Sequence, residues 1–302
     1  MDAHPDITRT RRNEINVKLV FTTLILIMLN LISTPIGNLN DISLRAIDVL
    51  KDADYIFAED TRNTNKLLKA INIDKKCRTL HEHNEAEVSK EIISLLKNKQ
   101  TEIALVSDAG TPAISDPGYI LIQDCIKNDI KFTLIPGPSS VISGLVLSGL
   151  PTSSFSFLGF VPRKLNQKKT FFNELKYEKK TIILFESAKR IENTLELLKD
   201  EYSEIKKIAL CREMTKLYEN IERGSVSSIL EKVKNGEVIL KGEFVIVLEA
   251  YSSDKPKFIL DKKVHEAFLK YLPAKDAAKL ISLVTKENKR EIYKQLLDQN
   301  PL

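Results

Sequence analysis

Apolar residues gather in short continuous runs through residues 28–150, and amphipathic stretches separate these runs. The runs contain many β-branched and large apolar residues, as strands buried on both faces of a parallel sheet do. They are LNLIS (29–33), DYIFA (54–58), EIALV (102–106) and FTLI (132–135). The stretches between them repeat apolar residues at helical spacing, in ISLRAIDVLKDA (42–53), TNKLLKAI (64–71), VSKEIISLLKN (88–98) and GYILIQDCIKN (118–128). Strands that alternate with helices predict a parallel sheet with right-handed crossovers.

The pattern changes after residue 150. Strand-like runs continue as FSFLGF (155–160), TIILFE (181–186), KIALCR (207–212) and EFVIVLEA (243–250), but longer charged helices such as IENTLELLKD and VSSILEKVKN separate them. Seven prolines lie from Pro35 to Pro162 and none between there and Pro256, which also marks a change of architecture. Residues 256–302, with DAAKLISLV and REIYKQLLD, have the pattern of a small helical appendage.

These patterns predict the α/β fold class, with two α/β domains and a small C-terminal helical segment. We expect an N-terminal extension at 1–27, an N-terminal α/β domain at 28–150 with the ligand loops, a mixed α/β domain at 151–252 and the helical appendage at 253–302.

The N-terminal segment RTRRNEINVKLVFTTLILIMLNLIS (9–33) has a basic stretch and then an apolar run, in the manner of a signal peptide. The run is short for a membrane span, which needs about 20 residues, and it lacks a small-x-small cleavage site. The competing interpretation makes LNLIS (29–33) a buried strand that enters the TPIGN turn. We favour the strand, with 1–27 a loosely attached extension and Met28 the start of the folded unit, and we expect no membrane association.

Composition narrows the class of protein. The chain has 302 residues, of which 43% are hydrophobic and 29% charged, as in globular proteins with substantial cores. Its three cysteines are scattered and include no CxxC pair, which favours a reducing cytoplasm over disulfides or a zinc site. His81 and His83 form a His-x-His pair, but no nearby cysteine completes a ligand set, so we expect no metal.

The net charge of +5 is unevenly distributed along the chain. Residues 254–302 hold eleven Lys and Arg against seven Asp and Glu. Such a basic segment is compatible with a phosphate-rich partner, and equally with a solvated helical surface.

Three Gly- and Pro-rich loops each follow a predicted strand of one sheet. They are STPIGN (33–38), VSDAGTPAISDPG (106–118) and IPGPSSVISGL (135–145), called loops one, two and three below. Open α/β sheets bind ligands at this edge, and three such loops together favour a ligand cleft over three ordinary turns. The absence of GxGxxG and GxxxxGK[ST] sequences disfavours a nicotinamide enzyme and a P-loop NTPase.

Each loop suits a different part of a ligand. The Pro-x-Gly turn of loop one lets the backbone approach a ligand closely, and loop two exposes backbone groups for an adenine edge or an amino-acid moiety. In loop three a serine caps a helix whose N-terminus suits a carboxylate. The candidate ligand-binding residues are Pro35, Gly37, Asp108, Ala109, Gly110, Thr111, Pro112, Ile114, Ser139 and Ser140.

A series of motifs extends through the chain in a fixed order. They are TPIGNLNDISLRA, AEDTRNTNKLL, HEHNE, SDAGTPAISDPG, IPGPSS, SGLPTSSFSFLGFVPRK, CREMTK and KGEFVIVLE. From about Met28 to the C-terminus the chain therefore resembles the ribosomal RNA small subunit methyltransferase I family of the tetrapyrrole-methylase superfamily. The loop SDAGTPAISDPG distinguishes this branch from the tetrapyrrole methylases and diphthine synthase, which have a shorter Gly-Asp-Pro version.

The resemblance implies a cytoplasmic homodimer of the tetrapyrrole-methylase fold, with S-adenosylmethionine in the cleft between the two domains. It also implies 2′-O-methylation of a cytidine in the decoding region of 16S rRNA in the small ribosomal subunit. One departure lies in FESAKR (185–190), where Ala188 and Lys189 replace the Pro and His of the family's Glu-Ser-Pro-His-Arg. Lys189 still offers a positive charge to phosphate.

A ribose 2′-hydroxyl is a weak nucleophile, so this reaction calls for positioning and for a base or an oriented hydrogen-bond acceptor. In AEDTR (58–62), Glu59 or Asp60 is a candidate proton acceptor, and Arg62 would hold a phosphate or the carboxylates. The alternative is that Asp60 or Thr61 only caps the next helix and Arg62 is its surface charge. His83 in HEHNE is a further candidate base, against a purely structural hydrogen-bonding loop.

RNA contacts are expected from basic residues of the second domain, namely Arg163, Lys164, Lys168, Lys189, Arg190 and Arg212. Phe157 and Phe160 either stack on a base or pack in the core. Two other functions stay open: a methylase of tetrapyrrole or diphthine type, and a non-catalytic RNA-binding protein that keeps the fold. A basic RNA-facing surface argues against the first, and binding of S-adenosylmethionine would argue against the second.

Overall fold

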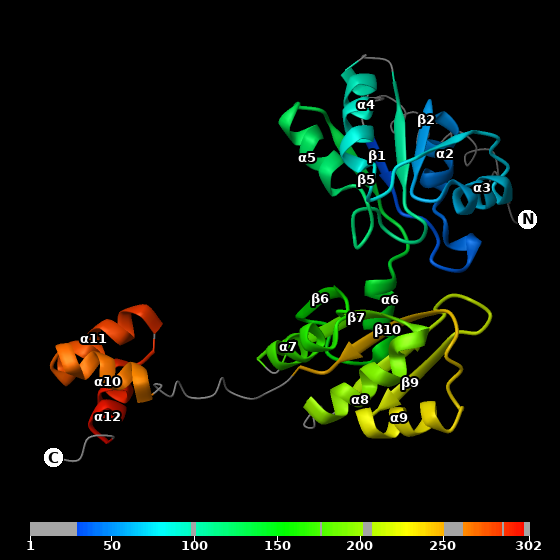
Figure 1. The fold of residues 1–302 in the computed structure, drawn as a ribbon. Coiled ribbons are helices and arrows are strands. Elements are labelled where there is room, and N and C mark those ends of the chain that lie inside the picture. The colour runs from blue at the N-terminus through cyan, green and yellow to red at the C-terminus, as the bar shows by residue number, and fades with distance from the viewer. Residues whose placement is uncertain are drawn as a thin grey trace, which may run out of the picture.

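The structure is a computed structural model that describes residues 29–97, 101–175, 177–201, 207–250, 262–285 and 287–298. Its ribbon shows two units built on sheets and a group of C-terminal helices (Figure 1). The predicted extension at 1–27 and the predicted start at Met28 lie outside the described residues.

The first sheet contains five parallel strands in the order β3-β2-β4-β1-β5. The strands are β1 (Leu29–Ile32), β2 (Tyr55–Ala58), β3 (Cys77–Thr79), β4 (Ile103–Val106) and β5 (Phe132–Ile135). The short helix η1 (Leu39–Asp41) and the helices α2 (Leu44–Asp52), α3 (Thr61–Ala70), α4 (Glu85–Lys97) and α5 (Tyr119–Lys127) connect them. The prediction of a parallel sheet with intervening helices is confirmed, and β3 is a strand that the apolar pattern did not predict.

Helices cover both faces of this sheet because successive side chains of a strand point to opposite faces. In β4, Ile103 and Leu105 pack in a cluster with α4 and α5, whereas Ala104 and Val106 pack in another with α2 and α3. All four residues of β1 and of β4 are buried, which accounts for their mainly apolar character; Asn30 of β1 is the one polar residue among them.

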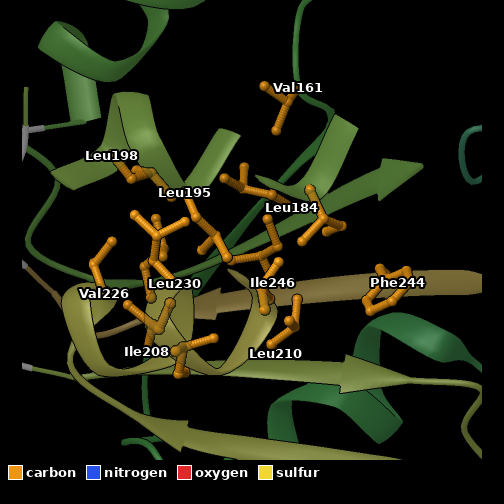
Figure 2. Close-up of a cluster of buried hydrophobic side chains, with 14 of the residues drawn as sticks. Val161, Leu184, Leu195, Leu198, Ile208, Leu210, Val226, Leu230, Phe244 and Ile246 are labelled. Carbon is orange, nitrogen blue, oxygen red and sulfur yellow. The ribbon is translucent and has the colours of Figure 1, made fainter. Parts of the chain in front are cut away.

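The second sheet is mixed, in the order β6-β7-β10-β8-β9. Its strands are β6 (Phe155–Phe160), β7 (Thr181–Ser187), β8 (Ile208–Arg212), β9 (Asn220–Gly224) and β10 (Glu243–Leu248). Only β6 and β7 pair in parallel, and the other pairs are antiparallel. On one face lie α7 (Leu165–Leu175), η2 (Ala188–Arg190), α8 (Ile191–Glu201) and α9 (Val226–Lys234), over the apolar cluster drawn in Figure 2.

The opposite face of this sheet is covered by α6 (Ser140–Ser148), the helix that follows loop three. A Cβ on Gly144 would stand 2.9 Å from Cγ1 of Val245, so the helix and β10 approach each other closely. By its packing, therefore, the second unit includes α6, which precedes the expected boundary at residue 151.

The C-terminal helices α10 (Lys262–Tyr271), α11 (Ala274–Thr285) and α12 (Lys289–Asp298) have an apolar cluster of their own, with Ala277, Ile281 and Ile292. Within the described part of the chain, the helices are too short or too polar to cross a membrane.

Candidate active site

A cavity of about 360 Å³ lies between the two sheet-based units, at the ends of β2 and β4. The first unit contributes Ile36, Glu59, Asp108, Ala109, Gly110, Thr111, Ile114, Ser115 and Asp116, and the start of α6 contributes Ser139, Ser140 and Val141. The second unit contributes Phe160, Phe185, Glu186, Ser187, Met214, Gly242, Glu243, Phe244 and Val245. Seven of the ten candidate ligand-binding residues line this cavity; Pro35, Gly37 and Pro112 do not, although Ile36 between the first two does.

Loops one and two are held together by hydrogen bonds. The amide of Thr34 donates to the carbonyl of Gly110 at 2.9 Å, and the amide of Gly110 donates back at 3.0 Å. Thr34 Oγ1 also donates to the carbonyl of Ser107. Gly110 has φ of 84°, a left-handed conformation that favours glycine. Gly110, which the sequence predicts to contact a ligand, therefore also sets the backbone conformation of loop two where it lines the cavity.

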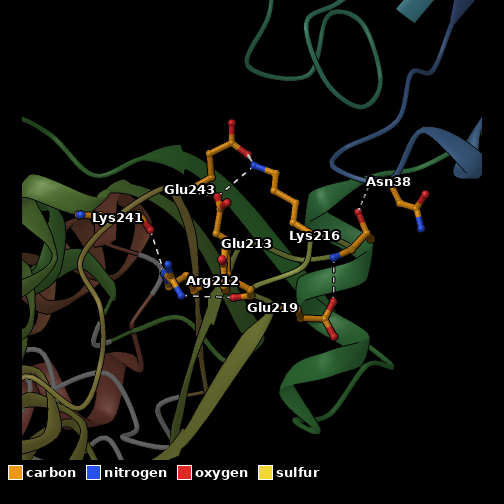
Figure 3. A network of polar contacts seen from close by, with 9 residues as sticks. Asn38, Arg212, Glu213, Lys216, Glu219, Lys241 and Glu243 are labelled. Atoms are coloured by element: carbon orange, nitrogen blue, oxygen red, sulfur yellow. Dashed lines mark hydrogen bonds and ion pairs between the residues drawn. The ribbon is translucent and has the colours of Figure 1, made fainter. Parts of the chain in front are cut away.

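Loop one also contacts the second unit, at Gly37. A Cβ on this residue would lie 2.4 Å from Cγ of Lys216 and 2.6 Å from Oγ1 of Thr215, so only glycine fits. The amide of Asn38 donates to Thr215 Oγ1 at 3.1 Å. Figure 3 shows Asn38 at the edge of the polar network that includes Lys216 and Glu219. The predicted ligand approach of Gly37 stays a prediction, and the structure shows its close approach to the other unit.

The charged side chains that line the cavity are all acidic: Glu59, Asp108, Asp116, Glu186 and Glu243. No Lys, Arg or His of the described chain lines it. Two of the five have a cation beside them. Glu243 pairs with Lys216 at 2.9 Å, and Glu186 pairs with Arg190 at 2.6 Å. The remaining carboxylates make the cavity attractive to a cationic ligand.

The carboxylate of Asp108 ties loop two to the end of β2. Its Oδ1 accepts from the amide of Asp60 at 2.9 Å, and its Oδ2 accepts from Nδ2 of Asn63 at 3.0 Å. These bonds bring the AEDTR motif to the cavity, as predicted from its position after a strand.

Two carboxyl groups in this region have raised pKa values. Burial raises the pKa of Glu59, and the nearby charge of Asp108 adds to the effect. Burial, and to a smaller extent repulsion from Glu59, raises the pKa of Asp116 to about 7. A hydrogen bond from Ser107 acts in the opposite direction. Asp116 was not among the predicted site residues. Its signal was available, since it is the second aspartate of SDAGTPAISDPG, the most informative loop.

Asp60 and Arg62 lie outside the cavity lining and bind each other. Oδ1 of Asp60 accepts from the amide of Arg62 at 2.8 Å and caps α3. Hydrogen bonds from Arg62 lower the pKa of Asp60 to about 2, so this carboxylate has little affinity for a proton. This geometry agrees with the helix-capping alternative for Asp60, with Arg62 85% exposed on the surface.

The HEHNE segment holds the end of loop two through hydrogen bonds. Glu85 is buried, and its Oε1 accepts from the amides of Gly118 and Ile120 at 2.9 and 2.8 Å, at the start of α5. His83 is exposed and does not line the cavity. The segment thus has the hydrogen-bonding role that was the alternative to a catalytic His83. Among the described residues, no group of three or more His, Cys, Asp or Glu is placed to hold a metal ion.

Two of the basic residues expected to contact RNA are buried. Lys168 is 3% exposed, and its Nζ donates to Asn193 and Thr194. Arg212 is 8% exposed, and its guanidinium donates to the carbonyls of Lys241 and Tyr218. The predicted RNA contacts of Lys168 and Arg212 do not fit this structure, because the charged groups of both residues are buried and donate hydrogen bonds to oxygen atoms inside the protein.

The other four basic residues lie differently. Arg190 is partly buried and bound to Glu186, Ser187 and Val161. Arg163, Lys164 and Lys189 are exposed. Both phenylalanines contact the ring of Phe185, with ring centroids 4.8 Å away for Phe157 and 5.3 Å away for Phe160. Phe160 is nevertheless 57% exposed and lines the cavity.

Comparison with known proteins gives consistent matches. The family described as Tetrapyrrole (Corrin/Porphyrin) Methylases matches residues 28–230. Ribosomal RNA small subunit methyltransferase I of Xylella fastidiosa is 37% identical over 266 residues, which is 88% of this chain and 97% of that protein. The protein of the same name from a Hydrogenobaculum species is 47% identical over 222 residues, which is 73% of this chain and 94% of that protein.

Two solved structures share the fold. A diphthine synthase aligns with a TM-score of 0.56 at 15% identity, over 74% of this chain and 90% of that one. A uroporphyrin-III-C-methyltransferase from Thermus thermophilus aligns with a TM-score of 0.52 at 18% identity, over 74% of this chain and 94% of that one. The predicted fold class is confirmed by these matches and by the two sheets.

Proposed function

Because the chain belongs to the tetrapyrrole methylase family, in the branch of the ribosomal RNA small subunit methyltransferase I proteins, we propose that it methylates 16S rRNA. The reaction is transfer of a methyl group from S-adenosylmethionine to the 2′-hydroxyl of a cytidine ribose in the decoding region. The acceptor is the small ribosomal subunit or its RNA.

The observation that supports the cofactor is the acidic cavity. S-adenosylmethionine carries a positive sulfonium and a positive ammonium, and the cavity is lined by carboxylates with no basic side chain among the described residues. When bound, the cofactor supplies a methyl group activated by the sulfonium. The residues present fit such a group: Glu59 and Asp108 for its positive charges, and Ser139 and Ser140 at the start of α6 for its carboxylate.

The apolar part of the lining suits the adenosine. Ile36, Val141, Met214 and Val245 line the cavity and offer surfaces on which a purine ring can pack. The carbonyl and amide groups of loop two, at residues 108–111, complete the polar edge of the same site.

RNA would approach from the rim, because the carboxylates of the cavity repel phosphate. Phe160 is 57% exposed and Ile114 is 46% exposed, and both line the cavity, so they offer an apolar surface to a nucleobase. Arg163 and Lys164 follow directly after β6 in the chain and are exposed, as is Lys189. We therefore assign the RNA phosphates to these three residues rather than to Lys168 or Arg212.

We also propose a homodimer that works in the cytoplasm. The edge strand β5 exposes Phe132 and Leu134, and Leu44 nearby is 81% exposed; Arg45 donates to the carbonyl of Leu134 in the same region. An apolar sheet edge of this kind favours pairing with another chain, here a second copy. Sedimentation equilibrium would test this: a monomer at all concentrations would contradict it.

The reaction is tested with purified protein, labelled S-adenosylmethionine and small subunits from a strain that lacks the enzyme. We expect one ribose 2′-O-methyl group per subunit, mapped by its resistance to alkaline cleavage. Cofactor binding is measured separately by calorimetry. If the protein binds S-adenosylmethionine but incorporates no methyl group into RNA, the proposed substrate is wrong. If it does not bind S-adenosylmethionine, the proposed methyltransferase activity is wrong. A tetrapyrrole acceptor offered in parallel should receive no label.

A further inference from the structure

Asp116 stands where the cavity meets its exposed rim. The residue lines the cavity, and Ser115 before it lies beside β6, since a Cβ on Gly159 would stand 3.7 Å from Ser115 Oγ. Phe160 follows Gly159 and is exposed at the same cavity. Asp116 therefore belongs to the cavity lining and follows, in the chain, the residue that contacts β6 next to the surface proposed for the nucleobase.

The backbone around Asp116 is held in an unusual conformation. Ala113 and Ser115 have φ of 66° and 62°, which costs a residue other than glycine about 1–3 kcal/mol. The amide of Ala113 donates to the carbonyl of Pro117 at 3.2 Å and closes the loop. Glu85 fixes its far end through the amide of Gly118. The loop is thus preorganised and presents Asp116 in a defined position.

The other acidic residues of the site already have partners. Arg190 neutralises Glu186 and Lys216 neutralises Glu243. Both oxygens of Asp108 accept hydrogen bonds from the start of α3. Glu59 accepts a hydrogen bond from the backbone of Asp108, whereas the hydrogen bond to the carboxylate of Asp116 comes from the side chain of Ser107.

We propose, building on the function above, that Asp116 is the catalytic base that takes the proton from the substrate hydroxyl, and that Glu59 is its positioning partner. As the hydroxyl proton passes to a carboxylate oxygen of Asp116, the hydroxyl oxygen forms its bond to the methyl carbon. The electron pair of the broken carbon–sulfur bond stays on sulfur, which becomes a neutral thioether. Asp116 then releases the proton to water, so charge and atoms balance.

The groups that face Asp116 set its proton affinity. Glu59 comes from the end of β2, and Asp108 and Ser107 come from the end of β4. Glu186 and Glu243 of the second unit line the same cavity and are paired with Arg190 and Lys216. Burial and the charge of Glu59 raise the pKa of Asp116 to about 7, and the Ser107 hydrogen bond partly offsets this. A base is most effective when its pKa lies near the working pH, and Asp116 meets that condition whereas Asp60, at about 2, does not.

The first test compares Asp116→Asn with the parent in single-turnover methyl transfer. The parent rate should rise with pH through about 7 and then level off, because the base must be deprotonated. Asp116→Asn should lose about 100-fold or more in rate, together with this pH dependence, and should keep cofactor affinity within about threefold. Glu59→Gln should move the inflection to lower pH, since it removes the repulsion. Glu87→Gln, on an exposed position of α4, serves as a control with the parent profile.

The second test needs no substrate and no cofactor. An unfolded aspartate titrates near 3.9, while folded Asp116 holds its proton to about 7, so the folded parent loses stability as pH rises between these values. Asp116→Asn lacks this loss. The Tm of Asp116→Asn minus the Tm of the parent should therefore increase from pH 4 to pH 7 and stay constant above pH 7.

Three results would overturn the proposal: a Tm difference that does not change with pH, a near-parent rate in Asp116→Asn, or a rate loss matched by lost cofactor binding. The last would make Asp116 a cofactor ligand instead. Failure of the parent itself to methylate RNA would count against the proposed function, and the Tm comparison would still report on Asp116.

Discussion

Arg190 lies beside a buried carboxylate, so Arg190→Ala tests whether this residue supports the fold or contacts RNA. The side chain of Glu186 is 0% exposed, and Nη2 of Arg190 lies 2.6 Å from its Oε1. The guanidinium also donates to the carbonyl of Val161 and to Oγ of Ser187, both at 3.1 Å. Removing one partner of a buried ion pair costs about 3–5 kcal/mol, because an uncompensated charge remains.

The lower end of that range applies here. Thr194 donates to Oε2 of Glu186 at 2.7 Å, and Lys168 donates to Thr194 at 3.0 Å, so a second cation lies behind the same carboxylate. We expect a loss of about 3 kcal/mol in the free energy of unfolding, or about 6–12 °C in Tm when the two sheet-based units unfold together.

Urea unfolding followed by circular dichroism measures this loss, with Lys189→Ala as the matched control. Lys189 is the exposed neighbour on η2, so its replacement should change stability by less than about 0.5 kcal/mol. If Lys189 binds a phosphate, its variant should instead weaken RNA binding and reduce the salt dependence by about one counterion. Equal stability of the two variants would refute the assignment of Arg190 to the fold.

Three further predictions concern other sites. Glu85→Ala should cost about 2 kcal/mol in urea unfolding, because charged hydrogen bonds to the start of α5 are lost; an unchanged midpoint would contradict this. Phe160→Ala should weaken RNA binding by about 5- to 100-fold in a filter assay and leave cofactor affinity unchanged, and equal loss of both would show that Phe160 holds the cofactor. Cys125 and Cys211 are buried, and burial raises their pKa values to about 11 and about 12, so thiol reagents should label them only after unfolding.

The elements with buried strands could be predicted from sequence alone. β1 and β4 are buried along their whole length, so their apolar runs identify them directly. β3 and β9 lie at the edges of their sheets and consist of CRT and NIERG, partly exposed residues without an apolar run. Their assignment needs the neighbouring strand that supplies the hydrogen bonds, and sequence pattern does not contain that partner.

For the site, the residue pattern was enough to predict which loops meet at the sheet edge and that Glu59 follows a strand. The role of each charged residue depends on tertiary contacts. Lys168 and Arg212 look like surface cations in the sequence, yet both are buried on internal oxygens, and Gly37 faces Lys216 of the other unit. Burial and ion pairing arise between segments far apart in the chain, and they set the pKa of a group such as Asp116. The local sequence around a residue does not predict those contacts.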